Sequence, residues 1–220
     1  MNPKIEMYLV KTPYLLKKIY PSSLIWNMPR TERAVYLTFD DGPIPEVTPW
    51  VLDTLKEFQA AATFFCIGDN VRKYPETFRR ILDEGHSAGN HTFHHLNGWK
   101  TADEHYLENI AKCAELVNSR LFRPPYGRIR RSQIRKLCPP SPPPAAADGW
   151  QLIMWDVLSG DFDTGLSPGK CLENVLKHTR GGSVVVFHDS LKAEKRLRYA
   201  LPLALERWKN QGFVFKKLPY

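Results

Sequence analysis

The stretch Tyr36-Leu37-Thr38-Phe39-Asp40-Asp41-Gly42-Pro43 is the segment around which this chain is organised. Residues 34–39 are a run of β-forming residues, which predicts a strand that ends at two adjacent carboxylates. Neighbouring side chains on a strand point to opposite faces, so Asp40 and Asp41 can serve one site only if the glycine and proline after them distort the backbone. Two carboxylates at the end of an apolar strand are costly to bury unless a cation or an arginine lies nearby. The alternative is a surface turn, in which Asp-Gly-Pro is common.

The composition is that of a globular protein with one sizeable core: 220 residues, of which 43% are hydrophobic and 25% charged. The 31 basic and 23 acidic side chains give a net charge of +8, which favours an anionic neighbour. Basic residues do not form a block interleaved with aromatic residues, so we predict no nucleic-acid partner. The four cysteines lie far apart, which indicates reduced thiols. With no signal-peptide pattern and no apolar run long enough to span a bilayer, we expect a cytoplasmic location and no transmembrane segment.

Residues 1–33 are predicted to form an N-terminal extension. Within residues 4–30, apolar side chains alternate with lysines around Pro13 and Pro21. A basic amphipathic stretch of this kind can lie on an anionic membrane surface. Because the prolines interrupt the apolar face, we predict instead that the extension packs on the domain that follows it.

From residue 34 onward, predicted strands and helices alternate. The strands are expected at residues 34–39, 61–67, 87–90, 121–123, 150–157, 183–187 and 213–215. The helices are expected at residues 46–58, 75–84, 103–119, 130–137, 168–179 and 191–209, the last one interrupted near Pro202. About seven strands in this order predict an α/β barrel or an open doubly wound sheet for residues 34–220. The proline-rich residues 138–147 are predicted to be an exposed loop within this domain.

Every polar group that we nominate as functional follows the carboxyl end of a predicted strand. In a parallel barrel, these strand ends and the loops after them carry the chemistry. The nominated segments are residues 40–41, 91–95, 123–127, 156–163 and 188–189. A chance distribution of polar residues would not favour this pattern, which indicates one site at one end of the barrel.

The segment 91–95 contains three histidines. On a helical turn, His91 faces the same way as His95 and as His94, so spacing leaves the choice between them open. Two imidazoles and one carboxylate are typical of a catalytic Zn²⁺ site that keeps one position for water. A histidine pair alone is more often a surface feature, but the acids at residues 40 and 41 favour the metal site.

Two further segments offer groups for hydrolysis. In Arg123-Pro124-Pro125-Tyr126-Gly127, the two prolines predict a rigid turn. A backbone N–H held in such a turn, here that of Tyr126, is suited to donate a hydrogen bond to an oxyanion. The alternative is a turn in which Pro-Pro only stiffens the loop. His188 follows an apolar strand, and Asp189 or a carboxylate near residue 161 can tune it as a proton donor.

Together these segments resemble the five motifs of the NodB-homology polysaccharide deacetylases, which are metal-dependent carbohydrate esterases. The family patterns are T-F-D-D-G-P, H-[S/T]-x-x-H, R-P-P-Y-G, a D-x-x-D-W-like motif and L-x-L-x-H. The corresponding residues here are 38–43, 91–95, 123–127, 156–162 and 184–188. The fourth match departs from the pattern, with a displaced first aspartate and Phe162 where the family usually has tryptophan. The resemblance covers roughly residues 34–216.

The resemblance implies a fold, an activity and a metal. The fold is a distorted (β/α)7 barrel in a single domain. The activity is removal of N-acetyl groups from an N-acetylated amino sugar or polysaccharide by attack of a metal-bound water, hence a hydrolase acting on non-peptide carbon–nitrogen bonds. The metal ligands are Asp41, His91 and His95, so the resemblance implies that His94 is not a ligand. The cation is expected to be zinc, with cobalt, nickel or manganese as alternatives.

The resemblance also implies the roles of the remaining site residues. Asp40 is the general base and Arg123 holds it in place, while His188 is the general acid and Asp161 orients it. The Tyr126 N–H binds the oxyanion. The substrate-binding wall is formed by Phe162, Val186 and Pro125.

Many members of this family are secreted and act on wall or chitin-like polymers, whereas no export signal is seen in this sequence. Deacetylation or deformylation of a lipid-linked sugar or a small amide is therefore the alternative activity. Two other hypotheses are a non-catalytic sugar-binding relative and a membrane-associated scaffold that uses residues 4–30.

Overall fold

The computed structural model describes residues 8–139 and 149–219. Its strands are β1 (Leu24–Ile25), β2 (Ala34–Asp40), β3 (Thr63–Cys66), β4 (Ser87–Asn90), β5 (Leu121–Phe122), β6 (Gln151–Ile153), β7 (Val157–Leu158), β8 (Ser183–His188) and β9 (Val214–Lys216). Its helices are α1 (Tyr14–Ile19), α2 (Thr48–Glu57), α3 (Gly68–Lys73), α4 (Pro75–Asp83), α5 (Asp103–Ala114), α6 (Arg131–Leu137), α7 (Pro168–His178) and α8 (Glu194–Asn210). A short 3₁₀ turn covers Pro125–Gly127.

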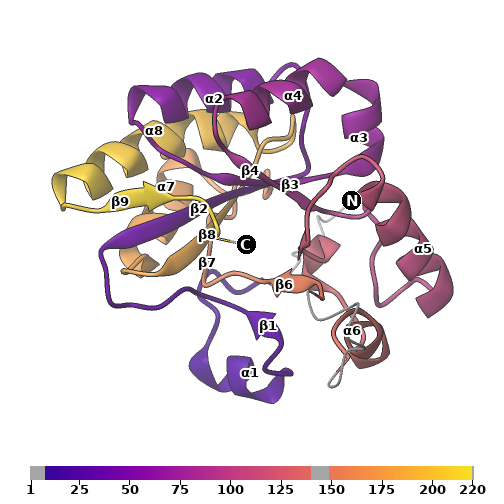
Figure 1. The fold of residues 1–220 in the computed structure, drawn as a ribbon. Helices are drawn as coiled ribbons and strands as arrows, with labels where there is room; N and C mark the ends of the chain where they lie inside the picture. Colours follow the sequence, from indigo (N-terminus) through magenta and orange to yellow (C-terminus); the bar gives the residue numbers. More distant parts are fainter. Residues whose placement is uncertain (1–7, 140–148, 220) are drawn as a thin grey trace.

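The strands form one parallel sheet in the order β1-β6-β5-β4-β3-β2-β8-β7, and β9 pairs with the beginning of β2. Strands β2 to β6 follow one another in chain order, and β8 and β7 continue the sheet on the other side of β2. In Figure 1, α2, α4 and α8 lie above the sheet, α5 and α6 lie to its right, and α1 lies below β1. The predicted distorted (β/α)7 barrel in a single α/β domain is confirmed.

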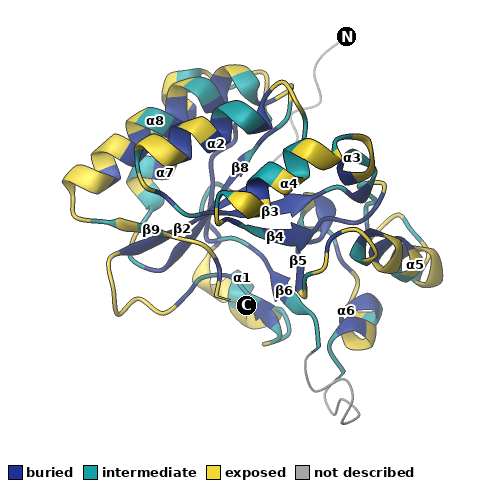
Figure 2. Cartoon of the chain, turned by 45° about the horizontal axis from the view of Figure 1, so that its top comes forward, coloured by how far each residue is buried: buried dark blue, intermediate teal, exposed yellow. Residues whose placement is uncertain are grey.

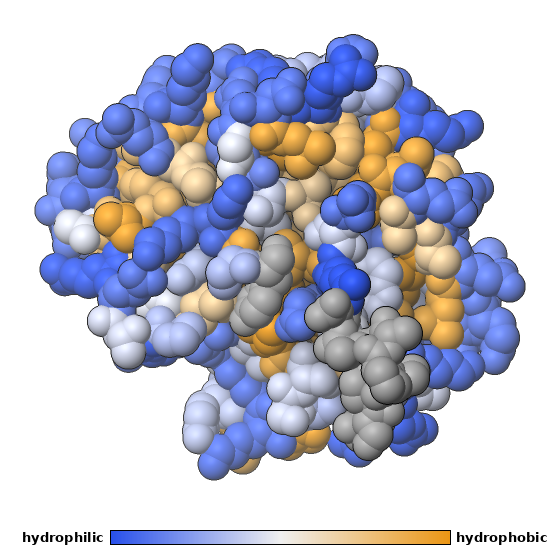
Figure 3. Space-filling view, viewed as in Figure 1, coloured by the Kyte–Doolittle hydropathy of each residue, from blue (hydrophilic) through white to orange (hydrophobic). Residues whose placement is uncertain are grey.

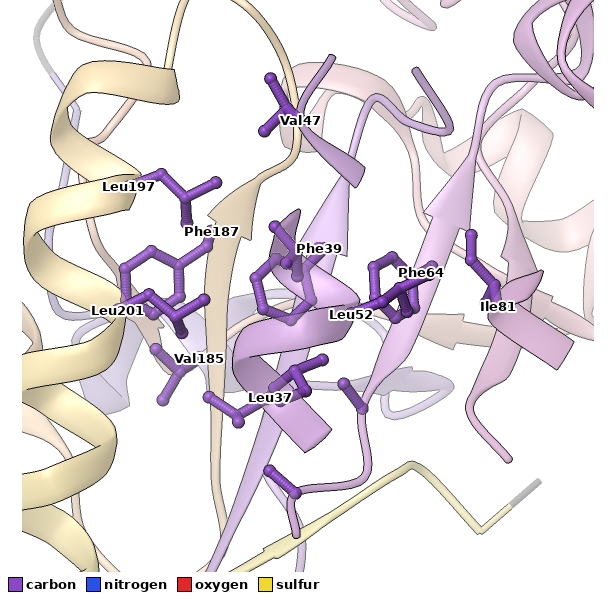
Figure 4. Close-up of a cluster of buried hydrophobic side chains, with 14 of the residues drawn as sticks. Leu37, Phe39, Val47, Leu52, Phe64, Ile81, Val185, Phe187, Leu197 and Leu201 are labelled. Atoms are coloured by element: carbon purple, nitrogen blue, oxygen red, sulfur yellow. The ribbon is translucent and has the colours of Figure 1, made fainter. Parts of the chain in front are cut away.

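The larger core lies between the sheet and its covering helices (Figure 4). Leu37 and Phe39 of β2 stand opposite Val185 and Phe187 of β8, and all four side chains are buried. The helices contribute Leu52, Leu197 and Leu201 to the same cluster. Replacing Phe39 by alanine would cost about 3–5 kcal/mol, which is a large part of the stability of an ordinary domain.

The opposite face of β2 and β8 lines the barrel interior. Tyr36 and Val184 lie there in a second cluster with Phe65 and Ile153. Because side chains alternate along a strand, Asp40 belongs to the interior row that starts with Tyr36. Strand β2 therefore delivers a carboxylate into the mouth of the barrel.

The covering helices bury only the faces turned toward the sheet. Figure 2 shows buried inner faces and exposed outer faces on α2, α4 and α8. On the face of the molecule seen in Figure 3, hydrophilic side chains cover most of the outer surface, and apolar side chains appear in patches between them. Among the described residues, no helix has the length and apolarity needed to cross a bilayer.

Some predicted elements differ from the observed ones. The prediction of one strand at residues 150–157 is wrong, because this stretch contains two short strands with different neighbours: β6 pairs with β1 and β5, whereas β7 pairs with β8. The predicted interruption of the last helix near Pro202 is also wrong. Helix α8 continues through this proline because its buried side, which includes Leu201 and Leu205, is held against the core. Helices α1 and α3 and strand β1 were not predicted.

The segment before β2 joins the barrel through one buried carboxylate. Asp156, fully buried at the start of β7, accepts from Lys11 (2.6 Å), Lys17 (2.7 Å) and Arg30 (3.0 Å), and also from Ser183 (2.7 Å). Strand β1 pairs with β6 nearby. Residues 1–7 of the predicted extension and residues 140–147 of the predicted proline-rich loop lie outside the described residues.

Candidate active site

The nominated residues come together at the carboxyl ends of four strands of the sheet, with β2 and β8 on one side of β3 and β4 and β5 on the other. Asp40 ends β2 and stands in register with His188, the last residue of β8. His91 follows β4 and Arg123 follows β5, which are themselves paired. One end of the parallel sheet thus gathers segments that are up to 148 residues apart in the sequence (from residue 40 to residue 188).

The two adjacent acids reach the same site because the backbone turns at Asp41. Asp41 has a φ of 84°, a left-handed conformation that residues other than glycine rarely adopt. The turn is held by Asn70, whose side-chain amide donates to the Asp41 carbonyl (2.7 Å), and by Ile67, whose N–H donates to the Gly42 carbonyl (2.9 Å). The predicted distortion is present, although it falls on Asp41 as well as on the residues after it.

Asp41, His91 and His95 form a compact group of possible metal ligands, with one donor atom from each within 4.8 Å of the others. Asp41 Oδ1 lies 3.2 Å from His95 Nε2 and 3.7 Å from His91 Nε2. His94 points elsewhere, with its Nδ1 2.9 Å from the side-chain amide of Asn109. Residues 91–95 do not form the helical turn on which the spacing argument was considered, because Thr92 and His95 have φ values of 61° and 55°.

The protonation of this group suits a divalent cation. His91 Nδ1 donates to the Arg123 carbonyl (2.8 Å), which leaves Nε2 with its lone pair on the side of Asp41. Burial lowers the pKa of His91 to about 4, so its imidazole is neutral. Burial would raise the pKa of Asp41, but the hydrogen bond from His95 and the nearby histidines outweigh it and hold that pKa well below its usual range. Two imidazoles and one carboxylate are an ordinary set of ligands for Zn²⁺ and similar ions.

Arg123 is fully buried and holds Asp40. Its Nη1 donates to Asp40 Oδ1 (2.6 Å) and to the Thr38 hydroxyl (2.8 Å). Its Nη2 donates to the Met154 carbonyl (3.0 Å), and the guanidinium lies over the Phe65 ring (4.1 Å). The carboxylate of Asp40 therefore has one fixed orientation beside the ligand group.

His188 and Asp161 form a second buried pair. Both oxygens of the Asp161 carboxylate bind His188, one to Nδ1 and one to the backbone N–H, each at 2.7 Å. Burial alone would lower the pKa of His188, but the charge and hydrogen bond of Asp161 outweigh it and raise the pKa to about 9. His188 is thus a cation at neutral pH and has a proton to give.

Comparison with known proteins identifies the family of this chain. Residues 27–137 match the model of the family described as polysaccharide deacetylase. A peptidoglycan-N-acetylglucosamine deacetylase from Bacillus cereus is 32% identical over 209 residues, which cover 91% of this chain and 94% of the relative. The chain belongs to the polysaccharide deacetylase family.

Other family members resemble it along most of their length. A chitooligosaccharide deacetylase from Azorhizobium caulinodans is 31% identical over 212 residues, covering 86% of this chain and 95% of the relative. The crystal structure of the Bc1960 peptidoglycan N-acetylglucosamine deacetylase has a TM-score of 0.82 and 32% identity, covering 94% of this chain and 95% of that one. The predicted class of enzyme, a polysaccharide deacetylase-like hydrolase of non-peptide carbon–nitrogen bonds, is confirmed by these comparisons.

Two of the remaining nominated residues of this polysaccharide deacetylase contact histidines of the site. Tyr126 has a φ of 59°, and its ring packs on the His95 ring (4.7 Å between centroids). The Phe162 ring meets the His188 ring edge-on (5.2 Å). Val186 is buried and lies on the same face of β8 as His188, and Pro125 is buried in the 3₁₀ turn.

Asp189 does something other than predicted. Its carboxylate accepts hydrogen bonds from the Thr48 hydroxyl (2.5 Å) and from the Gly42 N–H (3.1 Å). These hydrogen bonds stabilise the turn that carries Asp41, and neither of them is made to His188. Burial raises the pKa of Asp189 to about 8.

Sequence reasoning missed Asn109, which supports the histidine segment. Its side-chain oxygen accepts from the backbone N–H groups of Phe93 and His94, both at 2.9 Å. Asn109 is only 4% exposed on α5. An asparagine within the apolar stripe of a predicted helix was the signal that could have identified it.

Proposed function

We propose that this chain is a metal-dependent deacetylase that hydrolyses the N-acetyl group of an N-acetylated amino sugar or polysaccharide. The observation that carries the proposal is the position of the Asp41, His91 and His95 donor atoms, beside the Asp40–Arg123 pair and near His188 and Asp161. A general base and a general acid on either side of three possible metal ligands are the groups that metal-dependent hydrolysis of an amide requires.

The proposed cofactor is a divalent cation held by Asp41, His91 and His95. Zinc suits these ligands, and cobalt, nickel and manganese are alternatives. When bound, the cation would polarise the amide carbonyl and lower the pKa of a water molecule.

Asp40 is proposed as the general base that takes the proton from the attacking water. Arg123, a permanent cation, holds this carboxylate in place beside the ligand group through the hydrogen bond from its Nη1. As the carbonyl carbon becomes tetrahedral, the negative charge on its oxygen is proposed to accept a hydrogen bond from the Tyr126 N–H. A donor of this kind is typically worth about 3–4 kcal/mol in the transition state.

His188 is proposed as the general acid. It gives its proton to the amide nitrogen as the carbon–nitrogen bond breaks, which releases acetate and the free amine of the sugar. Asp161 orients the imidazole through Nδ1, so that Nε2 is the nitrogen that faces the substrate.

We further propose that Phe162, Val186 and Pro125 form the wall against which the acetyl methyl packs. Their positions support this role, since Phe162 contacts His188 and Val186 lies on the same face of the strand. We also propose residues 34–220 as the catalytic barrel and residues 1–33 as an extension packed on it.

The proposed substrate is a glycan that contains N-acetylglucosamine, because two of the relatives are named for deacetylation of peptidoglycan N-acetylglucosamine and of chitooligosaccharides. The test is to incubate the protein with N-acetylated oligosaccharides, lipid-linked N-acetyl sugars and small amides, and to measure acetate and formate. We expect acetate from an N-acetylglucosamine oligomer, no release after chelation, and recovery when a divalent cation is returned. Full turnover by the chelated protein would contradict metal dependence. Binding of the oligomer without release would instead identify a non-catalytic sugar-binding relative.

A further inference from the structure

Helix α1 places apolar side chains in solvent. None of its residues is buried, and Tyr14, Leu15 and Ile19 are 72%, 70% and 58% exposed. With Leu9, they make four of the twelve large hydrophobic residues that the described part of the chain exposes. Single exposed apolar residues are normal, but a cluster of them marks an interaction site.

The inner side of α1 is fixed by contacts that keep this face outward. Lys17 donates to Asp156 (2.7 Å) and to Asn27 (2.9 Å), and its side chain is only 15% exposed. The Tyr20 ring packs edge-on against Trp26 (5.5 Å). Ordinary amphipathic helices bury their apolar side. Here a lysine points inward while the leucine and isoleucine point outward.

The exposed face continues into a groove between α1 and α6. Two adjoining cavities of about 280 Å³ and 430 Å³ share Ile19, Tyr20 and Arg131. Leu16 and Trp99 add apolar surface, and the guanidinium of Arg131 bridges the groove by donating to the Ile19 carbonyl (3.3 Å). The groove therefore combines an apolar lining with a basic rim.

The positive charges of this face have no acidic partners within the described residues. Lys18 lies over the Tyr14 ring, and none of the ion pairs between described side chains includes Lys18, Arg131 or Arg135. The acids at the start of α5 are already neutralised, because Asp103 pairs with Arg130 (3.6 Å) and Glu104 pairs with Lys136 (3.1 Å). An anionic partner would meet these charges without displacing an internal ion pair.

We propose that α1 and the groove between α1 and α6 dock on the surface of an anionic phospholipid bilayer. Leu15 and Ile19 enter the boundary between headgroups and acyl chains, and Lys18, Arg131 and Arg135 contact the phosphates. Aliphatic side chains beside unpaired cations are complementary to a surface that offers acyl chains and phosphate together. This attachment is separate from the proposed deacetylation and would persist in an inactive variant.

The test is co-sedimentation of the full chain with vesicles of phosphatidylcholine, with and without about 30% phosphatidylglycerol. We expect binding to the anionic vesicles only. Binding should fall at least about tenfold in Leu15→Glu combined with Ile19→Glu, and also in Arg135→Glu. Leu82→Glu on α4 and Arg207→Glu on α8 are matched controls, because both residues are exposed and lie on helices across the molecule from α1 (Figure 1). These controls should bind as the unmodified chain does.

The proposal is overturned if the unmodified chain does not sediment with anionic vesicles, or if Leu82→Glu reduces binding as much as the α1 variants do. Other occupants of the surface would give different results. A second copy of the chain would appear as a dimer that Leu15→Glu dissociates, and an acidic glycan would retain the chain where vesicles do not. Either result in the absence of vesicle binding also overturns the proposal.

Discussion

The carboxylate of Asp189 accepts a hydrogen bond from the backbone N–H of Gly42 and leaves no room for a side chain at that position. A Cβ added to Gly42 would collide with the carboxyl group of Asp189. The end of β8 thus fixes the turn after β2, on which Asp40 and Asp41 depend.

Gly42→Ala should therefore damage the ligand group without altering any proposed catalytic side chain. We expect the affinity for a divalent cation to fall about 10- to 100-fold and kcat/KM to fall by about 10² or more, because small displacements are costly in a preorganised site. Metal titration and deacetylation assays measure the two effects. Gly169→Ala is the control, since nothing lies within 4 Å of a Cβ at that glycine. Unchanged metal affinity in Gly42→Ala would show that the collision is relieved elsewhere.

Asp40→Asn should separate catalysis from metal binding. We expect kcat to fall by about 10²–10⁴, the usual contribution of a general base, while metal stoichiometry stays the same because Asp40 is not among the three ligand residues. The variant should also be less stable, because Arg123 keeps a buried charge without its carboxylate. The matched control is Asp69→Asn, which removes a carboxylate paired with Arg72 and Lys73 at the surface. Normal turnover in Asp40→Asn would exclude it as the base.

The pH dependence should report His188. Its pKa is raised to about 9, so the protonated general acid is present below that pH, and kcat/KM should fall as pH rises through it. Asp161→Asn removes the largest of the charges that raise this pKa and leaves only the more weakly acting Asp41 and Asp40 against the effect of burial, so the descending limb should move to lower pH. Asp163→Asn, which alters a carboxylate that binds Tyr8 and the Gly165 N–H, should leave the limb in place. An identical profile in Asp161→Asn would remove Asp161 from its proposed role.

Asp156 should matter for stability and not for turnover. Burial would raise its pKa, but the hydrogen bonds from Lys11, Lys17, Ser183 and Arg30 hold the pKa well below its ordinary value of 3.8. A lowered pKa means that the stabilisation is present above about pH 4 and is lost as pH falls below it. Asp156→Asn should lower the free energy of unfolding by about 2 kcal/mol at pH 7 and by less in acid. This value is smaller than the loss expected for a fully buried ion pair, because Lys11 and Arg30 are partly exposed and solvent screens their charges.

Urea denaturation at pH 7 and in acid measures this effect. Asp53→Asn is the control, because it removes a carboxylate that is 63% exposed and paired with Arg80. The interpretation of Asp156 fails if the two variants lose the same stability at both pH values.

Much of the site could be predicted because its chemistry lies in short contiguous motifs at the ends of strands. The β-forming run before Asp40 and the spacing of His91 and His95 both act locally, and the parallel order of the strands does the rest. The resemblance to a known family was needed to choose His95 over His94, since spacing alone left both open. The structure agrees with that choice in geometry, because His94 is turned toward Asn109.

What could not be predicted depends on contacts between distant parts of the chain. Asp156 looked like part of a catalytic motif, but its three cationic partners lie between residues 11 and 30, and no local pattern points to them. The short strand at Leu24–Ile25 exists only because β6 offers an edge for pairing. Asp189 was expected beside His188, but the backbone directs its side chain to Thr48.

The attachment of Lys11, Lys17 and Arg30 to Asp156 also dictates the order in which the chain assembles. Asp156 lies 145 residues after Lys11, 139 residues after Lys17 and 126 residues after Arg30 in the sequence. During synthesis, the segment from Lys11 to Arg30 therefore leaves the ribosome long before Asp156 has been made, and its three cations can bind Asp156 only after that. Contacts over such separations are slow to form, so the docking of this segment is a late event in folding.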